Sequence, residues 1–291
     1  MIDLHTHSTA SDGTLTPAEL IRAAAGKRLG TIALTDHDTI DGISEAQKAV
    51  DALEGQIRLI PGVELEIEWD RGEFHLLGLG LAAPSPSLLG LLDEFSRVRL
   101  NRNLAMLDKM NRLFGMNATY EEILAESKSP ASVGRPHFAS YLIRCRKVKT
   151  MELAFKRYLG VGLPLYVKKT GVDFARAATA IHESGGIAVI AHPATIYVSM
   201  GKLPDIFREL KEKGLDGIEA WHPNAKVHTC KRYETMAANM GLCVTAGSDF
   251  HGERRPDRKL GLTAGGLKID DRFLPDALRD SYAQPDPQFK E

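Results

Sequence analysis

The sequence predicts an α/β protein in which strand–helix units form a parallel sheet or barrel and a helical subdomain interrupts them. Strands alternate with helices of about 10–15 residues before residue 84 and again after residue 171, as in proteins built from βαβ units. Residues 84–171 instead show helical patterns without a recognisable strand. We therefore expect a barrel made of residues 1–83 and 172–291, with a helical insertion at residues 84–171.

The composition is that of an ordinary globular protein, with 43% hydrophobic and 26% charged residues among 291. The formal net charge of -1 argues against binding of duplex DNA through an overall basic surface. No apolar run approaches the roughly 20 residues that span a bilayer, and the N-terminus lacks the basic and apolar regions of a signal peptide. We expect a cytoplasmic protein without membrane association, in which Cys145, Cys230 and Cys243 are reduced.

The part before the insertion begins with an extended segment at residues 3–8. Thr16 and Glu19 have the spacing of a capping box around Pro17, which predicts a helix that ends by Gly30. The remaining elements of this part are, in chain order, a strand, a helix and two strands. They are expected at residues 31–35, 43–53, 57–68 and 73–78.

After the insertion, the sequence predicts a helix at residues 173–184 and then alternating strands and helices. These elements lie at residues 186–191, 203–213, 215–220, 226–240 and 242–247. The three strands among them end in the motifs AHP, WHP and SDFHG. Because the chemistry of parallel α/β barrels lies at the carboxyl ends of the strands, these motifs are candidate site positions. Residues beyond Gly261 are polar and predict no clear element.

The insertion is expected to contain four helices and to be strongly basic. The helices are predicted at residues 87–114, 119–127, 134–144 and 150–159, the second of which begins with a capping box at Thr119. The insertion carries 15 Lys and Arg against 7 Asp and Glu, a net charge of +8 that leaves about -9 for the rest of the chain. It is therefore the part of the chain best suited to bind an anion.

Potential metal ligands recur at the predicted strand ends, where seven of the ten histidines lie. Residues two apart on a strand point to the same face, so His5 and His7 form one same-face pair and Asp249 and His251 form another. A lone strand-end histidine is more often a hydrogen-bonded core residue than a ligand, but this collection predicts a metal centre. Imidazole and carboxylate ligands without a thiolate suit Zn, Mn or Fe.

Six motifs, DLHTHSxxSDG, TDHD, GVE, FHLLG, AHP and GSDFHG, follow one another in this order. They resemble the PHP (polymerase and histidinol phosphatase) phosphoesterases of the amidohydrolase-like group, and more closely the TrpH-like branch. The resemblance covers residues 1 to about 262, including the insertion. It implies a distorted (β/α)7 TIM-like barrel, an insertion that covers the active site, and two to three divalent ions of Mn, Zn or Fe.

The resemblance further implies a trinuclear site with nine ligands, in which one carboxylate bridges two ions. The first ion would be held by His5, His7, Glu64 and Asp249. Glu64 would bridge it to a second ion, whose other ligands would be His75 and His192. The third ion would be held by Asp12, His37 and His251. Each of these positions carries a residue of the expected ligand type.

Clustered divalent ions suit phosphoester hydrolysis because they activate water, bind phosphate oxygens and stabilise charge on the leaving oxygen. The sequence contains no GxSxG elbow, no P-loop and no GxGxxG after a strand, so it suggests no other mechanism. The predicted catalytic residues are Asp249 and His192, as metal ligands, and His222. Because the implied ligand set leaves His222 out, this residue either supports the site from behind or protonates the leaving group. The equally simple alternative is a hydrogen-bonded residue at a strand end with no part in the reaction.

The basic insertion is the predicted source of substrate specificity. Arg135 lies at a predicted helix N-terminus, where backbone N–H groups favour an anion and a guanidinium adds bidentate contacts with phosphate. His137 in the same motif would contact substrate or cap its helix. Four further basic residues are candidates, although a solvated position is the simpler interpretation of each: Arg99, Arg102, Lys168 and Lys169.

Two phosphate sites, one at the metals and one in the insertion, predict a substrate with two separated phosphates. The leading hypothesis is removal of the 3'-phosphate from a nucleoside 3',5'-bisphosphate such as pAp, an activity expected within the resembling branch. The alternatives are 5'-to-3' trimming of short 5'-phosphorylated RNA, dephosphorylation of histidinol phosphate, and a non-catalytic nucleotide-binding module. A small nucleotide or a short oligonucleotide is thus the expected partner, and the sequence leaves the oligomeric state open.

Overall fold

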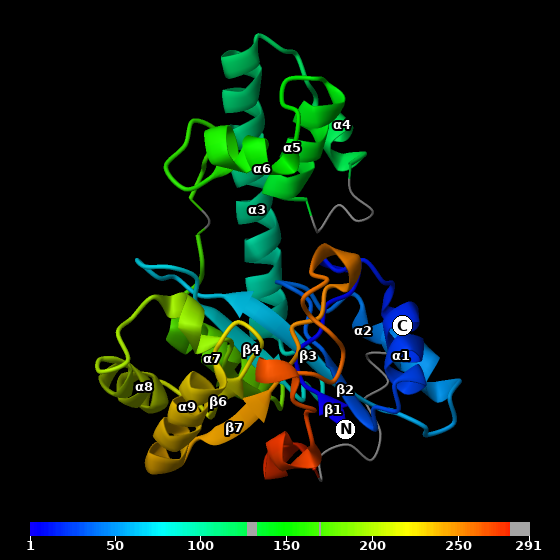
Figure 1. Ribbon diagram of the computed structural model, residues 1–291, viewed down its shortest axis with the longest axis vertical. Coiled ribbons are helices and arrows are strands. Elements are labelled where there is room, and N and C mark those ends of the chain that lie inside the picture. The colour runs from blue at the N-terminus through cyan, green and yellow to red at the C-terminus, as the bar shows by residue number, and fades with distance from the viewer. Residues whose placement is uncertain (127–132, 169, 280–291) are drawn as a thin grey trace. The chain divides into compact units, whose positions relative to one another are not determined.

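The structure is a computed structural model that describes residues 1–126, 133–168 and 170–279. The chain divides into two compact units. Met1–Leu92 and Gly171–Glu291 form the barrel unit, and Asp93–Thr170 forms the helical unit, drawn in teal and green in Figure 1. The first boundary between these units lies within helix α3 (Pro86–Phe114).

The barrel unit is built on one sheet, in which seven strands follow one another in sequence order. The strands are β1 Ile2–Asp3, β2 Thr31–Leu34, β3 Arg58–Glu66, β4 His75–Leu79, β5 Ile187–Ile190, β6 Gly217–Trp221 and β7 Cys243–Ala246. All neighbours pair in parallel except β4, which is antiparallel to β3 and to β5. The expected parallel sheet therefore has one exception. Its cause is the connection at residues 67–74, which is too short for the crossover that parallel strands require.

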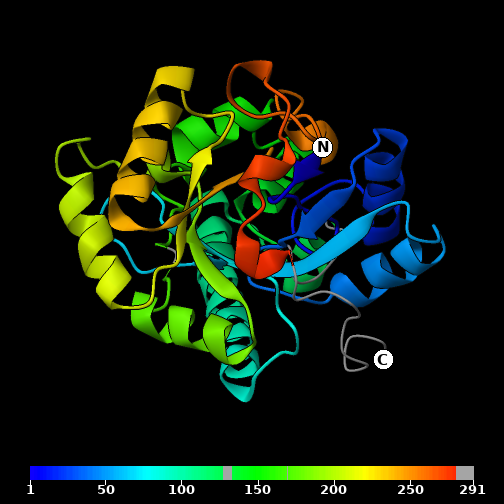
Figure 2. The ribbon, with the colours of Figure 1, turned by 90° about the horizontal axis from the view of Figure 1, so that it is seen from below.

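The first and last strands are joined by the segments that follow them. The backbone N–H of Leu4 donates to the carbonyl of Ala246 at 3.3 Å, and that of Asp249 donates to the carbonyl of His5 at 2.9 Å. A third bond runs from the N–H of His7 to the carbonyl of Phe250 at 3.0 Å. The sheet is thus nearly closed into a barrel, and Figure 2 shows its strands with helices around them.

The principal helices of the barrel unit lie close to their predicted positions. They are α1 Pro17–Gly26, α2 Ile43–Asp51, α7 Phe174–Glu183, α8 Leu203–Glu212 and α9 Val227–Met240. At the start of α1, Thr16 accepts from the N–H of Glu19 and the Glu19 carboxylate accepts from the N–H of Thr16, which confirms the capping box. The helix ends at Gly26, before the predicted Gly30, and Arg28 then takes a left-handed backbone conformation with φ of 59°.

The helical unit has its own apolar core. Besides most of α3 it contains α4 Tyr120–Leu124, α5 Arg135–Arg144 and α6 Met151–Ala154, and a π-helical turn, η2, at Phe155–Leu159. The predicted helix at 150–159 is therefore α-helical only in its first part. Side chains such as Met106, Phe138 and Leu142 are fully buried in the core of this unit. Part of the predicted helix at 119–127 lies outside the described residues.

Residues 262–279, for which the sequence predicted no element, fold onto the barrel. They contain short 3-10 turns at Ala264–Gly266, Asp271–Phe273 and Asp276–Leu278. The Arg58 guanidinium donates to the carbonyl of Leu278, and the N–H of Ile2 donates to the carbonyl of Ile269 at 3.0 Å. The three cysteines are free. Within the described ranges, no helix is both long and apolar enough to cross a membrane.

Asp3, at the end of β1, is a buried carboxylate that joins distant segments. Its Oδ1 accepts from the N–H of Ser248 at 2.9 Å, and its Oδ2 accepts from the Ser248 hydroxyl at 2.6 Å and from the N–H of Gly261 at 2.8 Å. Burial raises the pKa of Asp3 to about 6, although these hydrogen bonds act in the opposite direction. The side chain thus holds the segment after β7 against β1.

We predict that Asp3→Asn lowers the free energy of unfolding by about 1–3 kcal/mol. The amide has one acceptor oxygen and an NH2 group, so at least one of the buried donors would face another donor. Urea denaturation in the presence of a chelator measures the effect. Asp276→Asn is the control, since the Asp276 side chain is fully exposed, and its change should stay within about 0.5 kcal/mol. Equal stability of Asp3→Asn and the parent would contradict the prediction.

Candidate metal centre

The barrel brings the predicted strand-end side chains together at one edge of the sheet. His5 and His7 follow β1, His37 follows β2, and Glu64 lies in β3. The members from the second half of the chain follow β5, β6 and β7: His192, His222, Asp249 and His251. His75 is instead the first residue of β4 and pairs in register with Glu66 near the end of β3. Because β4 is antiparallel, its beginning lies where the neighbouring strands end.

Glu64 lies at the centre of this arrangement and is completely buried. Its Oε2 faces three ring nitrogens at 3.0–3.3 Å, those of His5, His7 and His37. Its Oε1 faces two others at 2.9 Å, those of His75 and His192. Burial alone would raise the pKa of Glu64, but the imidazoles of His37 and His75 hold it well below its usual range. Both oxygens thus meet ring nitrogens, which is the arrangement of a carboxylate able to bridge two cations.

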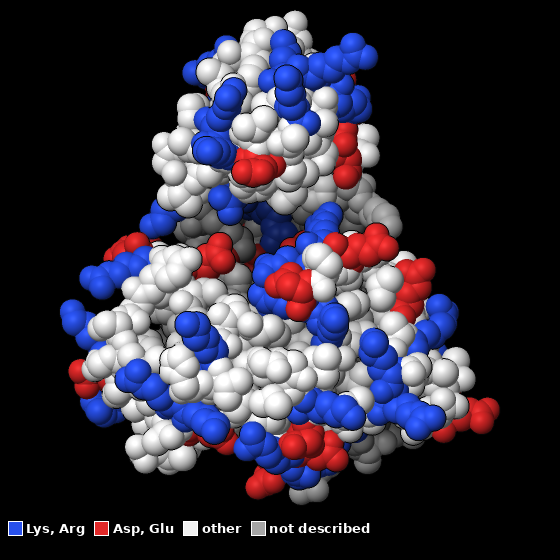
Figure 3. Space-filling model, in the orientation of Figure 1, with Lys and Arg blue, Asp and Glu red and all other residues white. Residues whose placement is uncertain are grey.

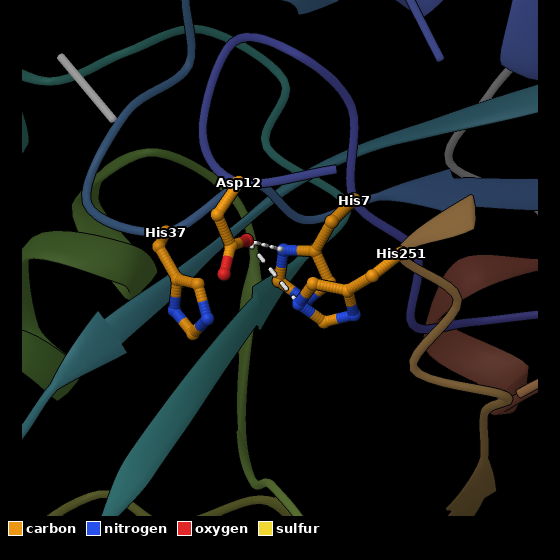
Figure 4. Close-up of side chains that lie close together, drawn as sticks. All are labelled: His7, Asp12, His37 and His251. Carbon is orange, nitrogen blue, oxygen red and sulfur yellow. Dashed lines mark ion pairs between the residues drawn. The ribbon is translucent and has the colours of Figure 1, made fainter. Parts of the chain in front are cut away.

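Asp12 and three histidines form a second cluster beside Glu64. Asp12 Oδ1 lies 3.2 Å from His251 Nε2 and 4.0 Å from His7 Nδ1, as the dashed lines in Figure 4 indicate. The ring of His7 stacks on those of His37 and His251, with centroids 4.6 Å and 4.1 Å apart. Burial alone would raise the pKa of Asp12. The neighbouring histidines, of which His37 has the largest effect, instead hold it well below its ordinary value.

The two same-face pairs predicted from the sequence also meet each other. His5 Nε2 and His7 Nε2 are 3.1 Å apart, as expected from residues two apart on an extended segment. Asp249 Oδ1 lies 3.5 Å from His5 Nε2, 3.3 Å from His7 Nε2 and 3.4 Å from His251 Nδ1. Four side chains from opposite ends of the chain therefore share one space.

The donor atoms of this site fit divalent metal ions. Among the residues that the structure describes, four groups of imidazole and carboxylate side chains are compact enough to hold an ion, since within each group the ligand atoms lie within 4.8 Å of one another. Several of these atoms are buried and, although polar atoms lie close to them, make no well-aligned hydrogen bond with the described residues: His7 Nδ1, Asp12 Oδ1, His37 Nδ1 and Glu64 Oε2. Buried polar atoms without partners are uncommon in native proteins, and a bound ion would satisfy them.

Comparison with known proteins agrees with this geometry. A sequence profile of the PHP domain matches residues 3–131. A protein of Haemophilus influenzae described as a 5'-3' exoribonuclease is 36% identical over 249 residues, covering 86% of this chain and 89% of that protein. The chain belongs to the PHP domain family. The family resemblance deduced from the six motifs is thus confirmed.

Two other PHP-type relatives extend the comparison. A protein of Chromobacterium violaceum described as a 3',5'-nucleoside bisphosphate phosphatase is 33% identical over 262 residues, covering 90% of this chain and 91% of that protein. A crystal structure from Bifidobacterium adolescentis, described as a putative metal-dependent phosphoesterase, superposes with a TM-score of 0.79 at 28% identity and covers 93% of each chain. The predicted barrel is therefore the fold of this PHP protein.

Most histidines of the site direct one ring nitrogen into the cluster, and their other ring nitrogen contacts a group outside it. The Nδ1 of His5 lies 3.0 Å from Glu219 Oε1, and the Nε2 of His75 lies 2.9 Å from Glu66 Oε2. Such outer partners orient metal-binding imidazoles and fix their tautomers. Two more histidines make similar contacts. His192 Nδ1 lies 2.9 Å from Thr195 Oγ1, and His251 Nδ1 lies 2.8 Å from the carbonyl oxygen of Asp249.

Sequence reasoning missed two buried carboxylates that support the site. Besides contacting His5, Glu219 accepts from the N–H of His192 at 2.7 Å through its second oxygen. Asp36 accepts from the N–H and hydroxyl of Ser8 and from the hydroxyl of Ser11, at 2.5–2.8 Å, and so holds the turn that carries Asp12. Glu219 had one available signal, since it is a carboxylate inside an otherwise apolar strand.

His222, whose role the sequence did not decide, is buried next to Asp249. Its Nε2 lies 3.2 Å from Asp249 Oδ2, and its Nδ1 accepts from the N–H of Asn224 at 3.2 Å. Arg258, which no sequence motif indicated, has its Nη1 2.8 Å from both Asp249 Oδ2 and His222 Nε2. Both ring nitrogens of His222 therefore have partners within the protein.

The predicted substrate-binding residues belong to the helical unit. Arg135 begins α5; its Nη1 donates to the carbonyl of Leu159 at 3.4 Å, and its guanidinium lies 5.8 Å from the ring centroids of Phe155 and Tyr166. His137 Nδ1 accepts from the N–H of Gly134 at 3.1 Å, so it caps its helix as one alternative predicted. Figure 3 shows that Lys and Arg predominate over Asp and Glu on the visible face of this unit.

The other basic candidates differ in their surroundings. Arg102 Nε donates to the carbonyl of Val167 at 3.1 Å, Arg99 is half-buried, and Lys168 is exposed. Lys169 lies outside the described residues. Arg135 thus combines a hydrogen bond to a backbone carbonyl with two aromatic rings near its guanidinium.

Proposed function

We propose that this PHP protein is a metal-dependent hydrolase of phosphoric esters. The observation that carries the proposal is Glu64, a buried carboxylate whose two oxygens face five imidazoles on two sides. The assignment of ligands is the one that the family pattern implies. It groups His5, His7, Glu64 and Asp249 for one ion, Glu64, His75 and His192 for another, and Asp12, His37 and His251 for a third.

In this proposal the ions, when bound, supply activated water and stabilise the charge that develops on phosphate and leaving oxygens. The chain supplies the geometry. Glu64 would offer one oxygen to each of two ions, and the buried Asp249 and His192 would supply further ligands to them. His222 acts by holding Asp249, since it is 1% exposed and both its ring nitrogens have protein partners. Zn, Mn and Fe all suit such a donor set.

Metal binding should release protons and weaken as the pH falls. Burial disfavours the His7 imidazolium, but contacts with Asp249 and Glu64 raise its pKa to about 10 in the metal-free protein. The pKa of His75 is likewise raised, by Glu64 and Glu66 against the effect of burial. The raised pKa values favour the positively charged imidazolium of both residues, whereas a metal ion binds the neutral ring.

Calorimetric titration with Mn²⁺ in buffers of different ionisation enthalpy measures this release, and we expect one or more protons per protein at pH 7. His182→Gln is the control, since His182 pairs with Asp216 on the surface and its replacement should leave the proton count unchanged. Binding with no proton release would contradict the assignment of His7 and His75 as ligands.

The proposed substrate is a nucleoside 3',5'-bisphosphate, from which the 3'-phosphate is removed to leave the 5'-monophosphate. The relative of Chromobacterium violaceum, which carries the name of this activity, supports the proposal over 90% of the chain. The net charge of +8 in residues 84–171 supports a second phosphate contact apart from the metals. Arg135 is the residue we assign to that contact.

Phosphate release from pAp, 3'-AMP and 5'-AMP tests the substrate. We expect kcat/KM for pAp to exceed that for 3'-AMP by about 10–100-fold, because one charged hydrogen-bonding contact is worth that much. Release from 5'-AMP should be slower still, since its phosphate is the one that the product retains. Equal turnover of all three compounds would refute the two-phosphate proposal. Unchanged turnover of pAp by Asp249→Ala and by His192→Ala would show that hydrolysis does not take place at this site.

Arg135→Gln should lower kcat/KM for pAp by about 10–100-fold and that for 3'-AMP, which lacks the 5'-phosphate, by much less. Arg144→Gln is the matched control, because Arg144 lies on the same helix and pairs with Glu126 on the surface. Equal losses for pAp and 3'-AMP in Arg135→Gln would assign Arg135 to the folding of the helical unit and not to the 5'-phosphate.

A second candidate function is 5'-to-3' hydrolysis of short RNA. Two observations favour it, the relative of Haemophilus influenzae at 36% identity and one of Salmonella typhimurium, also described as a 5'-3' exoribonuclease, at 34%. The same contact for a 5'-phosphate would serve both reactions. A labelled 5'-phosphorylated RNA that becomes shorter by one nucleotide at a time, with kcat/KM above that for pAp, would favour this candidate over the first.

A further inference from the structure

Arg258 is a buried arginine outside the proposed ligand set. It follows the short helix η4 (Gly252–Arg254) beyond β7, and only 5% of its surface is exposed. A guanidinium stays charged in proteins, so a buried one needs partners. Its Nη1 donates to Asp249 Oδ2 at 2.8 Å, and its Nε donates to Asp257 Oδ2 at 3.3 Å. Since the Asp257 side chain is 63% exposed, Asp249 is the partner at the buried end.

The contact with Arg258 gives the two oxygens of Asp249 different tasks. Oδ2 is occupied by Arg258 Nη1 at 2.8 Å and by His222 Nε2 at 3.2 Å. Oδ1 is directed at the opposite side, toward His5 Nε2 and His7 Nε2. A carboxylate held in this way can offer one oxygen to an ion but not both.

Arg258 also occupies a place that the donor atoms alone would assign to an ion. The ligand atoms of His5, His222 and Asp249 all lie within 4.8 Å of one another. Arg258 Nη1 lies 2.8 Å from atoms of two members of this group. A positive charge is therefore already present there, and it would repel a metal ion at the same place.

We propose that Arg258 is a positioning residue that fixes Asp249 so that only Oδ1 faces the ion shared with His5 and His7. The inference rests on the proposed function, because it requires that the cluster binds divalent ions. Without Arg258, Oδ2 loses its charged partner and the carboxylate can rotate about its last bond. An ion would then have to order the side chain before Asp249 could bind it.

Arg258 exerts two opposite effects on a bound ion, and the sign of the measured change separates them. Its positive charge repels a metal ion, so loss of that charge alone would strengthen binding. Loss of its support for Asp249 would weaken binding, by about 10–100-fold for a residue that orients a ligand. Asp249 pairs with the guanidinium at 2.8 Å and offsets much of its charge. Weaker binding is therefore the expected result.

The test is Mn²⁺ titration of the chelator-treated full-length protein, by calorimetry, with Arg258→Gln and Arg258→Lys. We expect Arg258→Gln to weaken the affinity for at least one ion by about 10–100-fold. The Mn²⁺ affinity of Arg258→Lys should lie between that of Arg258→Gln and that of the parent protein, because a lysine keeps the charge but cannot present the planar set of guanidinium donors. Arg255→Gln is the matched control, since Arg255 is 47% exposed and pairs with Asp257.

Thermal unfolding in chelator identifies a variant that fails to fold, and Arg258→Lys then decides the question alone. Unchanged or tighter Mn²⁺ binding by a folded Arg258 variant would overturn the inference and leave the proposed function intact. Absence of Mn²⁺ binding by the parent protein would instead refute the proposed function, and the inference with it. Weaker binding by Arg255→Gln of the same size would also overturn the inference, because the effect would not depend on contact with Asp249.

Discussion

The arrangement of the site depends on the burial of one negative charge, that of Glu64. A carboxylate removed from water is costly unless cations or hydrogen-bond donors surround it. Here imidazoles from five places in the chain face its two oxygens, and they hold its pKa well below the usual range although burial acts in the opposite direction. The same geometry suits two cations that share the carboxylate. The barrel can thus be understood as the scaffold that keeps these imidazoles around Glu64.

The antiparallel strand β4 and two strained turns serve this requirement. If β4 ran parallel to its neighbours, His75 at its first residue would lie at the opposite edge of the sheet from Glu64. His192 and Asp249 adopt positive φ angles of 28° and 51°, which are unfavourable for residues other than glycine. The strain lies at the two proposed ligands themselves, where Glu219 accepts from the backbone N–H of His192 and Arg258 donates to the carboxylate of Asp249. Rigid placement of ligands is therefore built at a local cost in stability.

Local features of the fold could be read from the sequence because they depend on neighbouring residues. The capping boxes at Thr16 and Thr119 and the main helices follow from side chains three or four positions apart, and the structure confirms them. The direction of β4 and the fold of residues 262–279 could not be predicted in this way. Both depend on which distant strand or turn each segment meets, and the bond from Arg58 to the carbonyl of Leu278 joins residues 220 positions apart.

The sequence by itself determined which side chains could form the site, since histidines and carboxylates at strand ends need only a strand period and a βα rhythm to be recognised. It also determined that His5 and His7 share a face, which follows from their spacing of two. Only the tertiary structure decided which groups contact these side chains from outside the cluster. Glu219 meets His5 across 214 positions, and Arg258 meets Asp249 beyond an irregular turn. Such partners follow no periodic pattern, because their positions are set by the closure of the barrel.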